Sequence, residues 1–333
     1  MPTGASSLDR RPQDGEGARI PRLAERLDIS AETSSSPVPV IAHLLDGTYE
    51  LFRHFYGARR WNKGKDAPLG AVRGVLGTVL RMIEDGATHL GVATDHVIES
   101  FRNDLWAGYK TGAGIDRALR KQFHPLEEAL EAMGVAVWAM VELEADDGLA
   151  SAAAIAARDR RVEMVCIWTP DKDLAQCVVG ERVVQMDRRG NAILDEKAVR
   201  AKYGISPERI PDFLALVGDA ADGYPGIPGV GRMTAARRIA RHGPIEAWPP
   251  DVMPDKRELA LRFKELATLR DDAPLFESVD AIEWRGPTKA FPAWAKRCGD
   301  PKLAERASSA ARARLQKARA QFRKRRGGRP SSG

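Results

Sequence analysis

Short apolar runs alternate with helical segments through the first half of the chain, and this alternation restricts the possible folds more than any other feature. The runs are residues 39–45, 89–94, 135–141 and 162–168. Each is shorter than a typical helix and mainly apolar, as expected of a buried strand. Strands separated by helices pair into mostly parallel sheets. The sequence therefore predicts an α/β fold with a doubly wound, mostly parallel sheet.

Three of these runs lead into an aspartate. Asp46 and Asp95 directly follow the first two runs, and Asp171 comes shortly after the last one. A parallel sheet gathers the carboxyl ends of its strands at one edge, which is where open α/β sheets bind their ligands. We therefore expect these three carboxylates to lie close together.

Further acids flank an Ala-rich run that predicts a helix. Glu144, Asp146 and Asp147 precede this run, and Asp171 and Asp173 follow the next strand. Close carboxylates repel one another unless cations neutralise them, and oxygen ligands without nearby Cys or His suit hard ions such as Mg²⁺ or Mn²⁺. In the alternative interpretation, Asp146 and Asp147 only cap the helix and favour its dipole. Together, the two clusters favour a metal site.

A basic and aromatic segment follows Asp95. It contains Arg102, Tyr109 and Lys110, and several glycines interrupt it. This composition is typical of a mobile element that surrounds a nucleic-acid backbone, with aromatic side chains available for stacking on bases. An exposed helix and turn with no such role is an equally good interpretation.

Two more acids, Asp219 and Asp222, precede a glycine-rich turn that leads into a basic helix. The candidate binding residues there are Gly226, Gly229, Gly231, Thr234, Arg237 and Arg238. The turn lacks the Gly-Lys-Ser/Thr end of a P-loop. Its backbone N–H groups and the following helix N-terminus can nevertheless hold a phosphate. The segment therefore predicts contacts with a phosphate backbone, and a plain helical hairpin is the alternative.

Cysteine usage and charge restrict the class of protein further. The three cysteines, Cys166, Cys177 and Cys298, form no close pair, which argues against a disulfide scaffold or a structural zinc and favours the cytoplasm. No apolar run approaches the roughly 18 residues of a membrane span, and the N-terminus lacks the apolar core of a signal peptide. The net charge is +6, yet residues 312–333 carry nine Lys or Arg residues and no acid. Such a basic tail predicts a polyanionic partner, although solvated tails are also common.

Taken in order, these motifs resemble the 5′ nuclease superfamily. The resemblance is to the N-terminal 5′–3′ exonuclease domain of bacterial DNA polymerase I and to stand-alone flap endonucleases, and it covers residues 38–285. It implies a PIN-like sheet with a helical arch near residues 108–121 and a helix–hairpin–helix or helix–three-turn–helix subdomain for duplex DNA. The implied division is a disordered extension (1–37), a nuclease domain (38–203), the DNA-binding subdomain (204–285) and a basic extension (286–333).

The resemblance also implies roles for individual residues. The first metal group would be Asp46, Asp95, Glu144 and Asp146, the second Asp171, Asp173 and Asp222, with Asp147 and Asp219 as additional acids in or behind the site. Lys110 matches the family's catalytic lysine, with Arg102 and Tyr109 beside it, and the glycine-rich turn matches a K⁺-binding module. Two positions depart from the family pattern, Pro170 before Asp171 and Gly223 after Asp222, and neither removes a carboxylate.

The expected function is structure-specific 5′–3′ exonuclease and flap endonuclease activity on DNA, with two Mg²⁺ or Mn²⁺ ions, in DNA repair or removal of replication primers. The expected substrates are 5′ flaps, 5′ ends and RNA–DNA primer junctions, and we expect a monomer without membrane contact. One alternative is a module that binds branched DNA without cleaving it, although the full set of acids argues against this. A second is a PIN-like ribonuclease, which would usually lack the glycine-rich module.

Overall fold

The computed structural model describes residues 39–62, 67–187 and 192–327, so the expected disordered extension lies outside the described part of the chain. Its centre is a six-stranded sheet with the strand order β3-β2-β1-β4-β5-β6. The strands are β1 (Val40–Asp46), β2 (His89–Asp95), β3 (Ala136–Met140), β4 (Val162–Trp168), β5 (Val183–Asp187) and β6 (Ala192–Leu194). All neighbours pair in parallel except β5 and β6. The predicted mostly parallel α/β sheet is confirmed.

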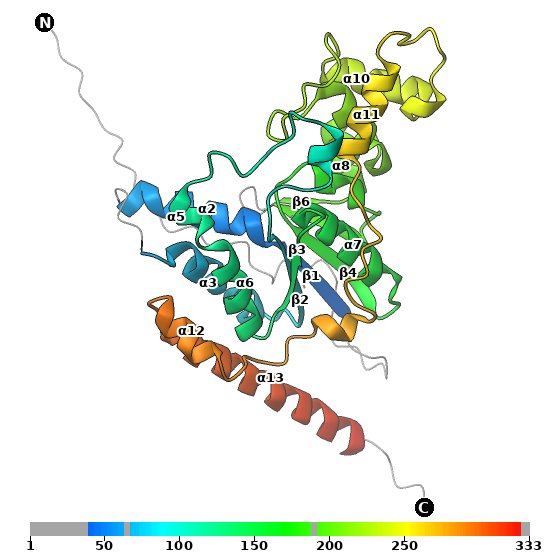
Figure 1. The fold of residues 1–333 in the computed structure, drawn as a ribbon. Coiled ribbons are helices and arrows are strands. Elements are labelled where there is room, and N and C mark those ends of the chain that lie inside the picture. Colours follow the sequence, from blue (N-terminus) through cyan, green and yellow to red (C-terminus); the bar gives the residue numbers. More distant parts are fainter. Residues whose placement is uncertain (1–38, 63–66, 188–191, 328–333) are drawn as a thin grey trace, which may run out of the picture.

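Helices cover both faces of the sheet, because the central strands are apolar on both sides. On one face, Leu45 and Val92 pack against α3 (Gly70–Glu84) and α6 (Phe123–Ala132). On the other face, Leu44 packs against the Ala-rich helix α7 (Ala145–Arg158). Figure 1 shows α7 on the side of the sheet opposite α3 and α6. This layering leaves the carboxyl ends of the strands at one open edge.

The turn after β1 fixes the first acid at that edge. Helix α2 (Gly47–Asn62) begins immediately after Asp46, so the chain must turn away from the sheet within one residue. A Cβ on Gly47 would lie 2.7 Å from Val92 Cγ1 and 2.9 Å from the carbonyl oxygen of Ala93. Only glycine lets the backbone pass β2 this closely, and Asp46 is held at the end of the strand as a result.

The helical second half of the chain has a core of its own. Its helices are α8 (Glu196–Tyr203), α9 (Ile210–Val217), α10 (Arg232–His242) and α11 (Arg257–Ala267). Phe213, Ile239 and Phe263 are buried together at its centre. The turn after α9 folds back on itself, since Gly218 and Gly226 both have positive φ (81° and 69°) and a Cβ on either would overlap the other's backbone. Figure 1 shows α8, α10 and α11 gathered at one end of the molecule.

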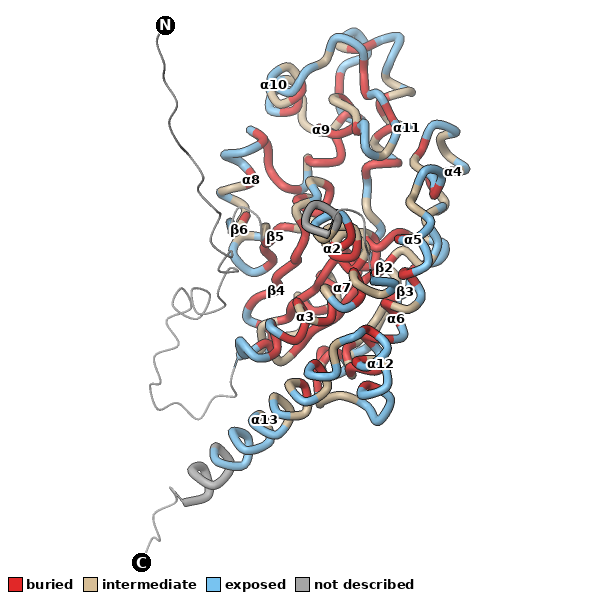
Figure 2. Tube along the Cα trace, turned by 90° about the vertical axis from the view of Figure 1, so that its left-hand side faces the viewer, coloured by how far each residue is buried: buried red, intermediate tan, exposed pale blue. Residues whose placement is uncertain are grey.

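Part of the chain beyond residue 285 packs against the body of the molecule. Short helix α12 (Phe291–Arg297) and long helix α13 (Lys302–Gly327) follow, and Phe291, Leu303 and Ala307 are at most 1% exposed in the core beside α3. The first part of residues 286–333, which we expected to form a basic extension, therefore packs against the body of the molecule. From Leu315 to residue 320, every residue of α13 is exposed, and Figure 2 shows the helix projecting from the body.

Two further expectations concern cysteines and membranes. Cys166, Cys177 and Cys298 are all free thiols. Within the described ranges, none of the helices combines the length and the apolar character required to cross a lipid bilayer.

Candidate active site

The predicted acids meet in a hollow of about 400 Å³ at the carboxyl edge of the sheet. Its lining includes Asp46, Asp95, Glu144, Asp146, Asp171 and Asp222, together with Lys110 and Thr48. The six acids come from the ends of β1 and β2, the N-terminus of α7, the loop after β4 and the turn after α9. Distant parts of the sequence thus converge on one pocket, as the strand ends predicted.

Asp46 is held in place by two donors. The backbone N–H of Tyr49 donates to its Oδ1 (2.8 Å), and the Thr169 hydroxyl donates to its Oδ2 (3.0 Å). The side chain is nevertheless almost fully buried, at 6% exposed. Burial, reinforced by the nearby charge of Asp95, outweighs these hydrogen bonds and raises the pKa of Asp46 to about 7. Without a cation, the pocket resists taking up negative charge.

The pKa values of Asp95 and Asp146 are also raised. Asp95 accepts a hydrogen bond from the backbone N–H of Ala145 (2.8 Å), which aims its carboxylate at the start of α7. Burial raises the pKa of Asp95 despite the opposing effect of Lys110. Burial and the charge of Asp171 raise the pKa of Asp146 well above its ordinary value. Divalent cations would neutralise the repulsion between these carboxylates and lower their pKa values.

A second cluster lies beside the first. Ligand oxygens of Asp173, Asp219 and Asp222 lie within 4.8 Å of one another. Asp173 is 5% exposed, and its buried Oδ1 has no hydrogen-bond partner, with Lys172 Nζ 4.0 Å away. Burial and the charge of Asp171 raise the pKa of Asp173. A buried carboxylate oxygen without a donor is costly, and an oxygen-seeking divalent cation fits this cluster.

Lys110 joins the two clusters. Its Nζ lies 2.8 Å from Glu144 Oε2 and 2.9 Å from Asp222 Oδ1, and the side chain is 33% exposed. Burial alone would lower the pKa of Lys110, but Glu144 and Asp222 outweigh it and raise the pKa. Burial would likewise raise the pKa of Glu144, yet Lys110 and Arg102 hold it below its ordinary value. The lysine therefore stands as a permanent cation in the mouth of the pocket.

Gly223, one of the two departures from the family pattern, has a structural reason. Its φ is 84°, and a Cβ there would lie 2.0 Å from the carbonyl oxygen of Gly108. The backbone N–H of Lys110 donates to the carbonyl oxygen of Asp222 (3.0 Å) across the same contact. A side chain at position 223 would push these two loops apart, and the lysine would move with them.

Arg102, Tyr109 and Asp147 lie beside the hollow and are not part of its lining. Arg102 and Asp147 are 1% and 0% exposed, bind one another and do not line the hollow. Tyr109 is 4% exposed, its hydroxyl lies 3.3 Å from Glu144 Oε2, and its ring belongs to the core of the helical half, so it cannot stack on a base. All three support the site from behind.

Three hydroxyl side chains that sequence reasoning missed complete the support. The backbone N–H of Asp95 donates to the Thr48 hydroxyl (2.8 Å), and the Ser100 hydroxyl donates to Glu144 Oε1 (2.6 Å). Thr169 holds Asp46, as described above. Thr48 and Thr169 each lie two residues from a predicted acid, which was the available signal. Ser100 carried none, because the nearest predicted acid in the sequence, Asp95, is five residues away.

The glycine-rich turn lies apart from the hollow. None of its predicted residues is among those that line the acidic pocket. Gly226 is buried and serves the backbone turn, whereas Gly229 and Gly231 are exposed ahead of α10. On α10, Arg237 is exposed, and Thr234 and Arg238 are half-buried. The exposed members of the set thus surround the N-terminal part of one basic helix.

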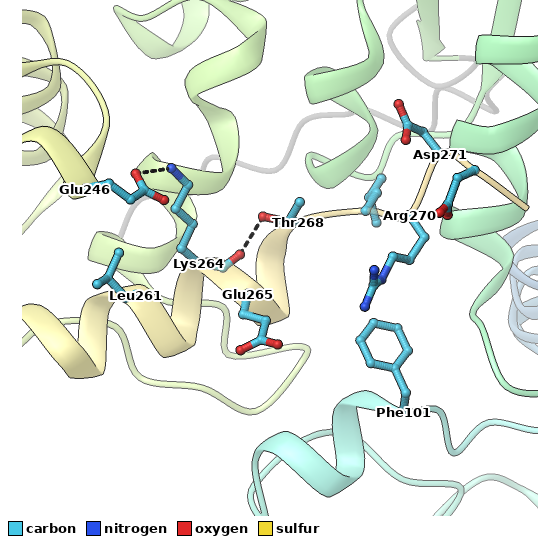
Figure 3. A pocket seen from close by; sticks show the side chains of 10 residues that line it. Phe101, Glu246, Leu261, Lys264, Glu265, Thr268, Arg270 and Asp271 are labelled. Carbon is cyan, nitrogen blue, oxygen red and sulfur yellow. Dashed lines mark hydrogen bonds and ion pairs between the residues drawn. The ribbon is translucent and has the colours of Figure 1, made fainter.

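A larger hollow, of about 530 Å³, lies between α11 and the segment that follows it. Its two cationic side chains are engaged with neighbours: Lys264 Nζ lies 2.7 Å from Glu246 Oε2, and the Arg270 guanidinium lies over the Phe101 ring at 5.2 Å. Figure 3 shows Lys264 turned toward Glu246 and Arg270 toward the ring. It contains none of the predicted site residues. The acidic hollow is therefore the candidate active site.

Comparison with known proteins gives a consistent picture. Residues 42–204 match the family described as "5′-3′ exonuclease, N-terminal resolvase-like domain", and residues 205–290 match "5′-3′ exonuclease, C-terminal SAM fold". The 5′-3′ exonuclease of Buchnera aphidicola is 32% identical over 205 residues, which are 61% of this chain and 67% of that protein.

Two longer relatives and one solved structure extend the comparison. The DNA polymerase I of Mycobacterium leprae is 31% identical over 76% of this chain, and that of Bacillus subtilis is 30% identical over 73%. The chain spans only 30% and 29% of the length of these polymerases. A crystal structure of bacteriophage T5 flap endonuclease with DNA and metal ions aligns with a TM-score of 0.56 at 19% identity, over 80% of this chain and 99% of that one. This likeness shows that the fold is shared.

Proposed function

Because the chain belongs to the 5′–3′ exonuclease family, we propose that it hydrolyses phosphodiester bonds of DNA at 5′ ends and 5′ flaps. The observation that carries this proposal is the convergence of six acids and one lysine on a single pocket at the sheet edge. Phosphoryl transfer requires this kind of electrostatic arrangement, since negative charge must be held and compensated at one point.

Metal ions of this metal-dependent family would be Mg²⁺ or Mn²⁺, bound in two groups. Asp46, Asp95, Glu144 and Asp146 would hold one ion, and Asp171, Asp173 and Asp222 the other, with Asp219 beside the second group. Such ions stabilise charge on the transferring phosphoryl group and lower the pKa of the attacking water. The fit rests on the all-oxygen donor set and on the buried Asp173 Oδ1 that has no hydrogen-bond partner.

Lys110 would contact the scissile phosphate. Its Nζ now compensates Glu144 and Asp222. If bound cations neutralised the acids of the pocket, the ammonium group of Lys110 would be free to turn toward a phosphate oxygen. Its 33% exposure would give it access to the hollow. The charges of Glu144 and Asp222 raise the pKa of Lys110 and so favour its ammonium form. The lysine would thus stabilise charge that grows as the bond breaks.

The helical half would grip duplex DNA. We take residues 38–203 as the nuclease domain and 204–285 as the DNA-binding subdomain. Exposed Gly229 and Gly231 precede α10, where Thr234, Arg237 and Arg238 follow. Backbone N–H groups, the helix N-terminus and these cations would contact phosphates, with a K⁺ ion bound at the turn. Binding would follow the shape of the DNA and would weaken with salt.

RNA–DNA primer junctions are proposed as further substrates because the family resemblance implies them, and the cytoplasm is proposed as the location because the three cysteines are free thiols. Neither rival interpretation has an observation in its favour. A non-cleaving binding module would not need the convergent acids. A PIN-like ribonuclease would not need the module formed by α9, α10 and α11.

Cleavage of an end-labelled 5′-flap duplex is the direct test. The protein should release the single-stranded arm in Mg²⁺ and in Mn²⁺ and should leave the DNA intact in EDTA. Matched flaps with a DNA arm and an RNA arm separate deoxyribonuclease from ribonuclease activity. Absence of cleavage of every flap in either metal would refute the proposal, and exclusive cleavage of the RNA arm would favour the ribonuclease.

A further inference from the structure

A second pocket, of about 410 Å³, borders the candidate active site. Ile98 lines both hollows, so one begins where the other ends. The lining residues are His96, Val97, Ile98, Arg120, Lys121, Phe123, His124 and Pro125. They come from the loop after β2, the end of α5 (Arg117–Arg120) and the start of α6. We call this the imidazole pocket.

Two histidine rings form a stacked platform in this pocket. The rings of His96 and His124 lie 4.2 Å apart and 7° from parallel. His96 Nδ1 is 2.8 Å from Glu127 Oε2, and Glu127, itself 6% exposed, also accepts a hydrogen bond from the Thr94 hydroxyl (2.8 Å). The inner ring is therefore fixed by a buried carboxylate, and His124 is the exposed ring of the pair. A fixed planar stack is a ready surface for another flat ring.

The charge of the lining complements a phosphate. Arg120 and Lys121 are exposed, and no carboxylate is among the lining residues. Glu99 lies outside the lining, although the charge of Arg120 helps to lower its pKa. Its carboxylate accepts a hydrogen bond from the backbone N–H of Gly112 (2.9 Å). A metal ion does not fit the histidine pair, because stacked rings do not aim their nitrogens at one point.

We propose that the imidazole pocket binds one nucleotide of the single-stranded DNA next to the cleavage position. Its base would stack on His124, and its phosphate would contact Arg120 and Lys121. A paired base in duplex DNA has no free face for such stacking, whereas an unpaired base does. This inference rests on the proposed nuclease function, since it takes the strand that enters the acidic hollow to continue past Ile98.

Binding of flap DNA in EDTA tests the pocket without cleavage. His124→Ala should weaken binding of a duplex with a single-stranded 5′ arm by on the order of 10-fold, and should leave binding of the same duplex without an arm unchanged. An arm made of abasic sites separates the two contacts, because it keeps the phosphates and lacks the bases. On that arm the His124→Ala effect should vanish, and the effect of Lys121→Ala should persist.

Arg160→Ala is the matched control, because Arg160 is exposed and remote from both pockets. It should change binding of neither DNA. Equal losses on DNA with and without the arm, or no loss for His124→Ala in a variant that unfolds like wild type, would overturn the imidazole pocket. Cleavage by wild type in Mg²⁺ is measured in parallel: if cleavage is normal while the arm effect is absent, the pocket fails alone, and if wild type cleaves nothing, the proposed function fails.

Discussion

Arg102 and Asp147 form a two-pronged ion pair in the interior, with Nη1 2.7 Å from Oδ2 and Nη2 2.7 Å from Oδ1. The same guanidinium reaches Glu144 Oε1 (3.2 Å) and the carbonyl oxygen of Leu266 (2.8 Å) at the end of α11. Asp147 in turn accepts the backbone N–H of Arg270 (2.8 Å). One buried pair therefore ties the acidic pocket to the helical half of the molecule.

Removing one partner of this pair should be costly for stability. Arg102→Ala leaves the Asp147 carboxylate buried without its cation, and we expect the free energy of unfolding to fall by about 3–5 kcal/mol. Arg102→Lys should recover only part of this, because an ammonium group cannot make the two-pronged contact. Urea unfolding measures both. If Arg102→Ala were as stable as wild type, the ion pair would not hold the two halves together.

Asp171→Ala should abolish cleavage and preserve binding of flap DNA. Asp171 lines the acidic hollow, and its Oδ1 accepts the backbone N–H of Asp173 (3.0 Å), so its loss disturbs both groups of acids. Glu163→Ala is the control, since Glu163 is exposed near the start of β4, the strand that leads to Asp171. Normal turnover by Asp171→Ala in Mg²⁺ would contradict a ligand role for this residue.

The position of the site could be predicted because it follows from strand ends. An apolar run shorter than a helix followed by an acid is legible in sequence, and parallel pairing then brings Asp46, Asp95 and Asp171 together. The role of each acid was harder to predict from the sequence. Asp146 and Asp147 are adjacent, yet helical geometry turns Asp146 to the hollow and Asp147 to Arg102. Sequence spacing alone therefore does not indicate which of two adjacent acids faces the hollow.

The C-terminal segment shows a second limit of sequence reasoning. The apolar face of α13 is thin, because small alanines and Leu303 suffice to pack against a helix as close as α3. Because α13 is rich in Lys and Arg, its composition does not reveal this apolar face. Arg306 pairs with Glu84 of α3 (2.7 Å), a contact between residues more than 200 positions apart that no local pattern can indicate.

Lys110→Ala should slow the chemical step by about 10²- to 10³-fold, the usual effect of removing one electrostatic contact to a transition state. Affinity for flap DNA should change little, since many other contacts hold the duplex. Single-turnover cleavage at saturating protein isolates the step, with Lys197→Ala as an exposed control on α8. An unchanged single-turnover rate would remove Lys110 from the catalytic set.

The stability of the metal-free protein should fall as pH rises from about 4 to 7. Burial raises the pKa of Asp46 from 3.8 to about 7, so across this window the folded state holds a proton that the unfolded state has lost. Unfolding then releases protons, and rising pH favours it, by on the order of a few kcal/mol. Urea unfolding in EDTA at pH 5 and pH 8 measures the difference. Asp46→Asn should reduce it, and a slope that this substitution leaves intact would assign the effect to other groups.

The projecting half of α13 should add salt-sensitive affinity for DNA without serving the chemistry. Truncation after Arg314 removes seven Lys or Arg residues and keeps the hydrogen bond from Arg314 to the carbonyl oxygen of Trp284, so the folded core should persist. Each phosphate contact contributes a slope of about −0.9 to the dependence of log K on log salt, and the truncated chain should show a shallower slope and weaker binding. Its single-turnover rate at saturation should match the full chain, because none of the described residues beyond Arg314 lines the acidic hollow. If the slope is unaltered, this part of the helix contacts no phosphates, and its charge is a solvated surface.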